Sequence, residues 1–131
     1  MPLYRRLLLA TLVLVTMSAC THSGGETRRL VVFFTADSAA LDDNAQSVIR
    51  QAAEVARSTP SASVRVLGLA APDTGSAAFN YTLAQARAQN VADGLVTAGV
   101  PQGRVRIESR GAVSFEMMPS ESRRVEIEID L

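Results

Sequence analysis

The chain has 131 residues, with 13 basic and 13 acidic side chains, one cysteine and one histidine. This length allows one domain, and the balanced charge argues against a nucleic-acid binder because no basic excess is available to neutralise phosphates. A single cysteine excludes an intramolecular disulfide, and no cluster of cysteines and histidines is present to bind zinc, so we expect neither a metal nor a cofactor.

The first twenty residues have the layout of a secretory signal. Two arginines at positions 5–6 precede an apolar stretch at 7–15, which is too short to span a bilayer because a spanning helix needs about 20 residues. The segment 17–20, Met-Ser-Ala-Cys, resembles the bacterial lipobox. That resemblance implies cleavage before Cys20 and acylation of this cysteine, and Thr21 after it implies sorting to the outer membrane. The alternative is an ordinary signal peptide with a chance cysteine.

These features predict three parts of the chain: a lipoprotein signal peptide at 1–19, a lipidated Cys20 with a short linker to residue 29, and a folded domain at 30–131. The linker is polar and contains Gly24 and Gly25. Removing residues 1–19 removes two of the 13 basic side chains, so 11 remain against 13 acidic ones, a net charge of about −2. This charge is too small for electrostatic membrane binding, so the lipid on Cys20 must hold the protein at the membrane.

The folded part begins with a short apolar run at 30–34 that predicts a buried strand. Asp42 or Asp43 can cap a helix, and the apolar residues after them recur at helical spacing: Ala45, Val48, Ile49, Ala52, Ala53 and Ala56. A second strand is predicted at 64–67, ending at Gly68. A second helix is predicted from Ser76 to about Ala98, because Gly99 and Pro101 follow as stop signals.

Two strands with alternating apolar residues complete the domain, one around Val105 and Ile107 and the other at 125–131. Arginines alternate on the first and acids on the second, which favours antiparallel pairing between these two strands. The predicted order is β-α-β-α-β-β. Helical crossovers imply an α+β fold with a mixed sheet and both helices packed on one face.

Candidate functional residues gather around the second predicted helix. Asn80 and Arg87 are seven residues apart, so two turns place them on one helix face, roughly 10 Å apart. The loop 68–75 leads into this helix, and its backbone N–H groups favour a carboxylate. Arg87 can bind a carboxylate through two hydrogen bonds, and Asp73 can bind an ammonium. Together they suit a zwitterionic amino-acid ligand.

An ordered set of short motifs resembles the OmpA-like C-terminal domain, a family shared with the peptidoglycan-associated lipoprotein. The motifs are Phe33-Phe34 with Asp37, Ser38 and Leu41; Gly75-Ser76-Ala77-Ala78-Phe79-Asn80, Leu83, Ala86-Arg87-Ala88 and Val91; Gly99-Val100; and Arg123-Arg124-Val125-Glu126-Ile127. The resemblance covers about residues 30–131. It implies non-covalent binding of peptidoglycan through the diaminopimelate of its stem peptide.

The same resemblance implies ligand roles for Arg87, Asn80 and Arg124. The family's ligand aspartate falls on Ala71 or Pro72, so the available carboxylate, Asp73, is displaced by one or two positions in an altered loop. Asp73 then has two interpretations, a ligand for the amine or an Asx turn in Pro-Asp-Thr-Gly. For Arg124 the alternative is an ion pair on the strand face with a neighbouring glutamate.

The leading hypothesis is therefore an outer-membrane lipoprotein whose periplasmic OmpA-like domain binds peptidoglycan and tethers the envelope layers. The alternative is a degenerate OmpA-like module that has lost peptidoglycan binding and contacts an envelope protein, with Phe115, Met117 and Met118 as its contact patch. An enzyme is disfavoured, since the folded part has no histidine or cysteine and no nucleophile–base arrangement.

Overall fold

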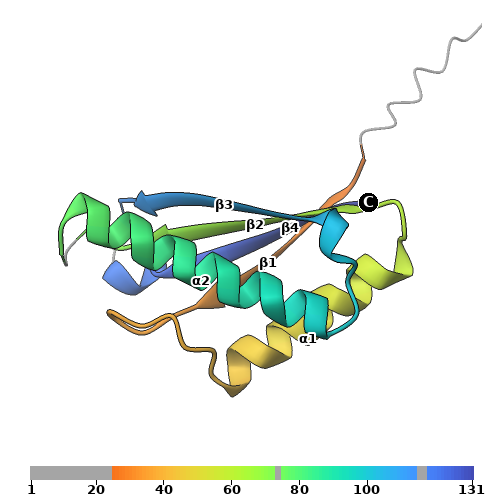
Figure 1. The fold of residues 1–131 in the computed structure, drawn as a ribbon, viewed down its shortest axis with the longest axis horizontal. Helices are drawn as coiled ribbons and strands as arrows, with labels where there is room; N and C mark the ends of the chain where they lie inside the picture. Colours follow the sequence, from red (N-terminus) through yellow and green to blue (C-terminus); the bar gives the residue numbers. More distant parts are fainter. Residues whose placement is uncertain (1–24, 73–74, 115–117) are drawn as a thin grey trace, which may run out of the picture.

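The computed structural model describes residues 25–72, 75–114 and 118–131. The elements in chain order are β1 (Thr27–Phe33), α1 (Asp43–Ser58), β2 (Ser63–Ala70), α2 (Ala77–Thr97), η2 (Gln102–Arg104), β3 (Val105–Ala112), η3 (Pro119–Glu121) and β4 (Arg124–Asp130). Both α-helices cover one face of a four-stranded sheet (Figure 1). The predicted two-layer arrangement is confirmed.

The first helix begins where its capping residue predicts. Asp42 accepts a 2.7 Å hydrogen bond from the backbone N–H of Ala45, which satisfies one of the free donors of the first turn. The apolar face predicted from the sequence is buried, with Val48 half-buried at its margin. Its alanines allow α1 to lie close to the sheet, where the helix contacts β1 and β4 and shares the core with Val32, Ile127 and Ile129.

The second helix also has the predicted bounds. Ser76 accepts a 3.1 Å hydrogen bond from the N–H of Phe79, and the helix ends before Gly99, whose φ of +103° few other residues adopt. Gly68 of β2 lies directly beneath α2, where a Cβ atom would overlap the carbonyl oxygen of Ala84. Glycine at this position therefore sets how closely α2 approaches the sheet.

The predicted pairing of the last two strands is wrong. The strand order is β1-β4-β2-β3, so β4 lies between β1 and β2 and is antiparallel to both, whereas β3 pairs with β2 in parallel. The charge pattern was assigned to the wrong neighbours. Glu128 of β4 is in register with Arg29 of β1 on one side and Arg65 of β2 on the other.

These three side chains form an ion-pair group on the face of the sheet that the helices leave open. Arg29 donates to Glu128 at 2.7 Å, and Arg65 donates to it through Nε at 2.9 Å and also through Nη2. The hydrogen bond from Arg65 is the main cause that lowers the pKa of Glu128. Glu128 is buried although both arginines are more than 40% exposed, so the arginines shield it from water.

The second strand is longer than predicted. It continues past Gly68 to Ala70, because Leu69 and Ala70 pair with Gly111 and Ala112 of β3 after a register shift. The predicted loop 68–75 is therefore wrong in its first half. Its backbone groups up to residue 70 belong to the sheet.

Candidate functional site

The side chain of Arg87 lies inside the molecule. It projects from α2, is 0% exposed, and donates to three backbone carbonyls: Nε to Ser38 at 2.8 Å, Nη2 to Thr35 at 2.9 Å and Nη1 to Leu69 at 3.3 Å. A planar guanidinium has five N–H groups, so three acceptors in different directions fix its orientation. Arg87 thereby ties α2 to the end of β2 and to the segment between β1 and α1.

The segment that receives these hydrogen bonds has an irregular backbone. Asp37 has a φ of +52°, a left-handed conformation that aspartate tolerates better than most residues. Asn90, one turn after Arg87 on α2, donates a 2.8 Å hydrogen bond to the carbonyl of Ala39. The connection between β1 and α1 therefore presents the carbonyls of Thr35, Ser38 and Ala39 to side chains of α2.

The charge of Arg87 has no carboxylate hydrogen-bonded to it among the residues with described positions. Burial and, to a smaller extent, the neighbouring Arg123 lower the pKa of Arg87 to about 10, while Asp37 opposes the shift. The guanidinium carbon lies 5.2 Å from the centre of the Phe34 ring, a distance at which the ring face attracts a cation. Arg87 therefore remains protonated at neutral pH and contributes a positive charge to this end of the domain.

Asn80 lies two turns before Arg87 on the same face of α2. It is 3% exposed, and its Oδ1 has no hydrogen-bond partner in the described part of the chain. A buried carbonyl oxygen without a donor costs about 1–3 kcal/mol, so natural structures rarely leave one unpaired. Asn80 is thus an available acceptor near the start of α2, where a bound ammonium can donate to it.

Of the two arginines at the start of β4, Arg123 lies near enough to Arg87 to influence its pKa. The ligand role expected of Arg124 stays a prediction. Arg124 donates to Glu126 at 2.8 Å through Nε and to the carbonyl of Glu121 at 2.6 Å through Nη1, so it forms the strand-face ion pair named as its alternative. Residues of β4 alternate between the two faces of the sheet, and Arg123 has the same parity as the buried Val125. That alternation was the sequence signal that identifies Arg123.

Several predicted residues lie outside the described positions. Asp73 is one of them, as are Cys20, Phe115 and Met117. Of the predicted contact patch only Met118 is described, and its side chain is 59% exposed. Neither interpretation of Asp73 therefore has a structural outcome.

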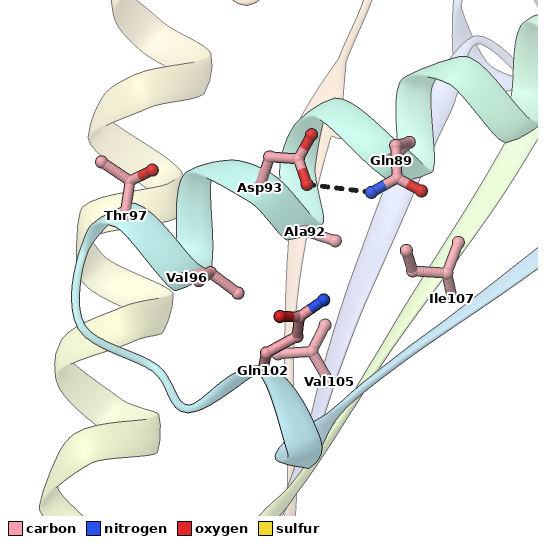
Figure 2. A pocket seen from close by; sticks show the side chains of 8 residues that line it. All are labelled: Gln89, Ala92, Asp93, Val96, Thr97, Gln102, Val105 and Ile107. Carbon is pink, nitrogen blue, oxygen red and sulfur yellow. Dashed lines mark hydrogen bonds between the residues drawn. The ribbon is translucent and has the colours of Figure 1, made fainter.

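A separate groove lies between the second half of α2 and β3 (Figure 2). It has a volume of about 270 Å³ and is lined in part by Asp93, Val96 and Ile107. Ile107, one of the alternating apolar residues of this strand, is 39% exposed because β3 is the edge strand and α2 covers it incompletely. This groove does not include Asn80 or Arg87.

Two further findings concern the described residues alone. None of their helices combines the length and apolar character that a membrane crossing requires. Their histidine, cysteine, aspartate and glutamate side chains form no group of three or more placed to hold a metal ion.

The chain is similar in sequence to a known protein family and to a named relative. A family model described as the OmpA family matches residues 33–124. Outer membrane protein 40 of Porphyromonas gingivalis is 39% identical over 82 residues, a match that covers 63% of this chain and 21% of that protein. The chain thus spans about a fifth of the length of this relative.

Solved structures share the fold. The peptidoglycan-associated lipoprotein from Burkholderia pseudomallei matches with a TM-score of 0.69 and 24% identity, over 76% of this chain and 89% of that one. The OmpA-like domain of FopA1 from Francisella tularensis matches with a TM-score of 0.71 and 24% identity, over 78% and 71% of the two chains. The periplasmic domain of Helicobacter pylori MotB matches with a TM-score of 0.68 and 21% identity, over 81% and 74%.

Proposed function

The chain belongs to the OmpA family, and we propose that its folded domain binds peptidoglycan non-covalently at the end that carries Arg87 and Asn80. One of the structures with this fold is a peptidoglycan-associated lipoprotein by name, which supports this class of ligand. The observation that carries the proposal is the pair formed by a buried, protonated Arg87 and a buried Asn80 oxygen without a donor.

The proposed recognised group is the side-chain end of diaminopimelate, which carries both a carboxylate and an amine. The carboxylate is attracted by Arg87 and by Arg123, which lies close enough to influence the pKa of Arg87. The hydrogen bonds of Arg87 to Ser38, Leu69 and Thr35 use one N–H on each of its three nitrogens, so two of its five N–H groups remain for a carboxylate.

The amine of the same group is proposed to donate to Asn80. A buried carbonyl oxygen gains most from a charged donor, because such a hydrogen bond contributes about 1.5–3 kcal/mol. Asp73 is proposed as the second partner of the amine, two residues after the buried Ala71 and just before α2. The carboxylate and the amine are bonded to the same carbon, so the side chains of Arg87 and Asn80, which project from α2 two helical turns apart, would converge on one small group.

We further propose that the domain is held at the outer membrane by acyl chains on Cys20. The first described strand begins at Thr27, so six residues, 21–26, separate this strand from the cysteine. Six residues span at most about 20 Å. The domain therefore stays close to the membrane surface and links it to the adjacent cell wall. Replacing Cys20 by serine should release the protein from the membrane fraction and abolish incorporation of labelled palmitate.

Co-sedimentation with purified sacculi tests the binding proposal. A soluble chain starting at Thr21 should sediment with sacculi, and Arg123→Gln should sediment less. Arg124→Gln is the matched control, because Arg124 is already paired with Glu126 and should leave sedimentation unchanged. A wild-type chain that stays in the supernatant, or an Arg87→Gln chain of native circular dichroism that sediments equally well, would favour the alternative of a module that contacts an envelope protein.

A further inference from the structure

The outer edge of the sheet provides a second interaction surface, far from Arg87. Strand β3 is the last strand in the order β1-β4-β2-β3, so its outer edge pairs with no strand of the described chain. Arg106, Ile107 and Glu108 in its middle are all exposed. A free strand edge presents a row of N–H and C=O groups that favours pairing with another strand.

From the charges on this edge we infer that two copies of the chain pair through β3, antiparallel, about a two-fold axis at Ile107. In this register Arg106 of each copy lies opposite Glu108 of the other. Ile107 of one copy lies opposite Ile107 of the other. Both opposite-charge pairs form at once because the axis is two-fold, and opposite charges directly across an antiparallel pair are favourable.

The neighbouring registers are excluded by the same charges. An axis at Glu108 places this glutamate opposite itself and Arg106 opposite Arg110. An axis at Arg106 places this arginine opposite itself, and the Arg104 that would then face Glu108 is held by carbonyls of its own chain. In the proposed register Arg104 faces Arg110, but Arg104 belongs to η2 and its guanidinium is held by the carbonyls of Ala56, Thr59 and Ala62. Its charge is therefore turned toward the end of α1 and away from the partner.

The groove between α2 and β3 is also suited to contact with a second copy of the chain. In Figure 2, Val105 and Ile107 of β3 lie on the side toward α2, together with Val96 of α2. Helix α2 contacts both β2 and β3, so the two α2 helices of the dimer would be separated by about two strand spacings, roughly 10 Å. This is the usual distance between packed helices. The α2 helix of the second copy would therefore lie along the groove and cover Val96.

This pairing leaves the proposed ligand site free. Because the two β3 strands run in opposite directions, the Arg87 ends of the two copies lie at opposite ends of one continuous sheet. Dimer formation and binding to peptidoglycan are thus separate properties. Failure of one leaves the other unaffected.

Cysteine cross-linking tests the register in the full chain, in detergent solution and with Cys20→Ser so that the introduced thiol is the only one. Ile107→Cys should form a disulfide-linked dimer on mild oxidation. Val105→Cys and Ser109→Cys should not link when oxidised separately but should link when mixed, because position 105 of one copy faces 109 of the other. Absence of the Ile107→Cys dimer, or linking of Ser109→Cys alone, would overturn the register.

Charge reversal in the Ile107→Cys background tests the attraction itself. Arg106→Glu or Glu108→Arg converts both pairs to like-charge pairs, and each should slow cross-linking at least about ten-fold. The double reversal Arg106→Glu/Glu108→Arg restores both pairs and should restore the original rate. Equal rates in all four chains would show that the edge charges do not direct the association and would overturn the proposal.

Discussion

The Nη2 of Arg87 donates a 2.9 Å hydrogen bond to the carbonyl of Thr35, a residue 52 positions earlier in the sequence. Together with the hydrogen bonds to Ser38 and Leu69, it makes one side chain of α2 the connection between three separate segments. The same side chain is the proposed attractor of the ligand carboxylate. Arg87 therefore contributes to the stability of the fold and, in this proposal, to ligand binding. Variants at this position must be measured for both the free energy of unfolding and binding to peptidoglycan.

Replacing Arg87 by alanine should lower the free energy of unfolding by about 2–4 kcal/mol, because the buried carbonyl of Leu69 and the part-buried carbonyls of Thr35 and Ser38 lose their donor. Arg87→Lys should cost about 1–3 kcal/mol, since an ammonium cannot reach acceptors in three directions. Urea denaturation followed by circular dichroism measures both values. Arg50→Ala, an exposed arginine on α1, should stay within about 0.5 kcal/mol of wild type. Equal losses at positions 50 and 87 would contradict the anchoring role.

Gly68→Ala should lower the free energy of unfolding by about 2–3 kcal/mol, because the added Cβ overlaps the carbonyl oxygen of Ala84 and pushes α2 away from the sheet. The matched control is Gly103→Ala, where no atom lies within 4 Å of the added carbon and almost no loss is expected. Thermal unfolding of the two variants distinguishes them. A Gly68→Ala protein as stable as the control would mean that α2 does not approach β2 so closely.

The Glu128 ion pairs make stability depend on pH. The pKa of Glu128 is lowered in the folded chain, so its contribution is fully present above the unfolded value of about 4.3 and is lost as the pH falls through the lower folded value. Glu128→Gln should therefore be less stable than wild type at pH 7, and the difference should shrink steadily below pH 4. Denaturation at a series of pH values measures this. Glu54→Gln, exposed on α1, should show no such convergence.

Asn80→Ala should be nearly neutral for stability although the residue is buried, because the loss of packing is offset by removal of an oxygen without a donor. Leu95→Ala in the same helix removes a fully buried apolar side chain and should cost about 2–5 kcal/mol. Binding to sacculi should show the reverse order, with Asn80→Ala weakened and a folded Leu95→Ala unaffected. A loss above about 2 kcal/mol for Asn80→Ala would indicate a structural role.

The local structure of this domain can largely be predicted from its sequence. Caps at Asp42 and Ser76, the stop at Gly99 and the spacing of apolar residues define both helices, because each signal acts within a few residues. The order of the strands cannot be predicted in this way. The arginines of β3 and the acids of β4 match well as neighbours, yet β2 separates these strands and its own Arg65 pairs with Glu128.

The candidate site could be predicted only in part, because signals within a few residues can be read from the sequence and contacts between distant segments cannot. Helical spacing places Asn80 and Arg87 on one face, but the three carbonyls that hold Arg87 come from segments distant in sequence. The choice between Arg123 and Arg124 depends on which face of the sheet the helices cover. Once Val125 is known to lie in the core, the alternation of the strand assigns Arg123 to the side of Arg87.

The most direct test of the central claim compares binding to two kinds of sacculi. Diaminopimelate differs from lysine by the extra carboxylate that Arg87 and Arg123 are proposed to attract, whereas both carry the amine assigned to Asn80. Quantitative co-sedimentation should give binding at least about ten-fold tighter for sacculi with diaminopimelate than for sacculi with lysine at that position, since a charge-assisted contact is lost. Equal affinity for both kinds of sacculi would contradict the account.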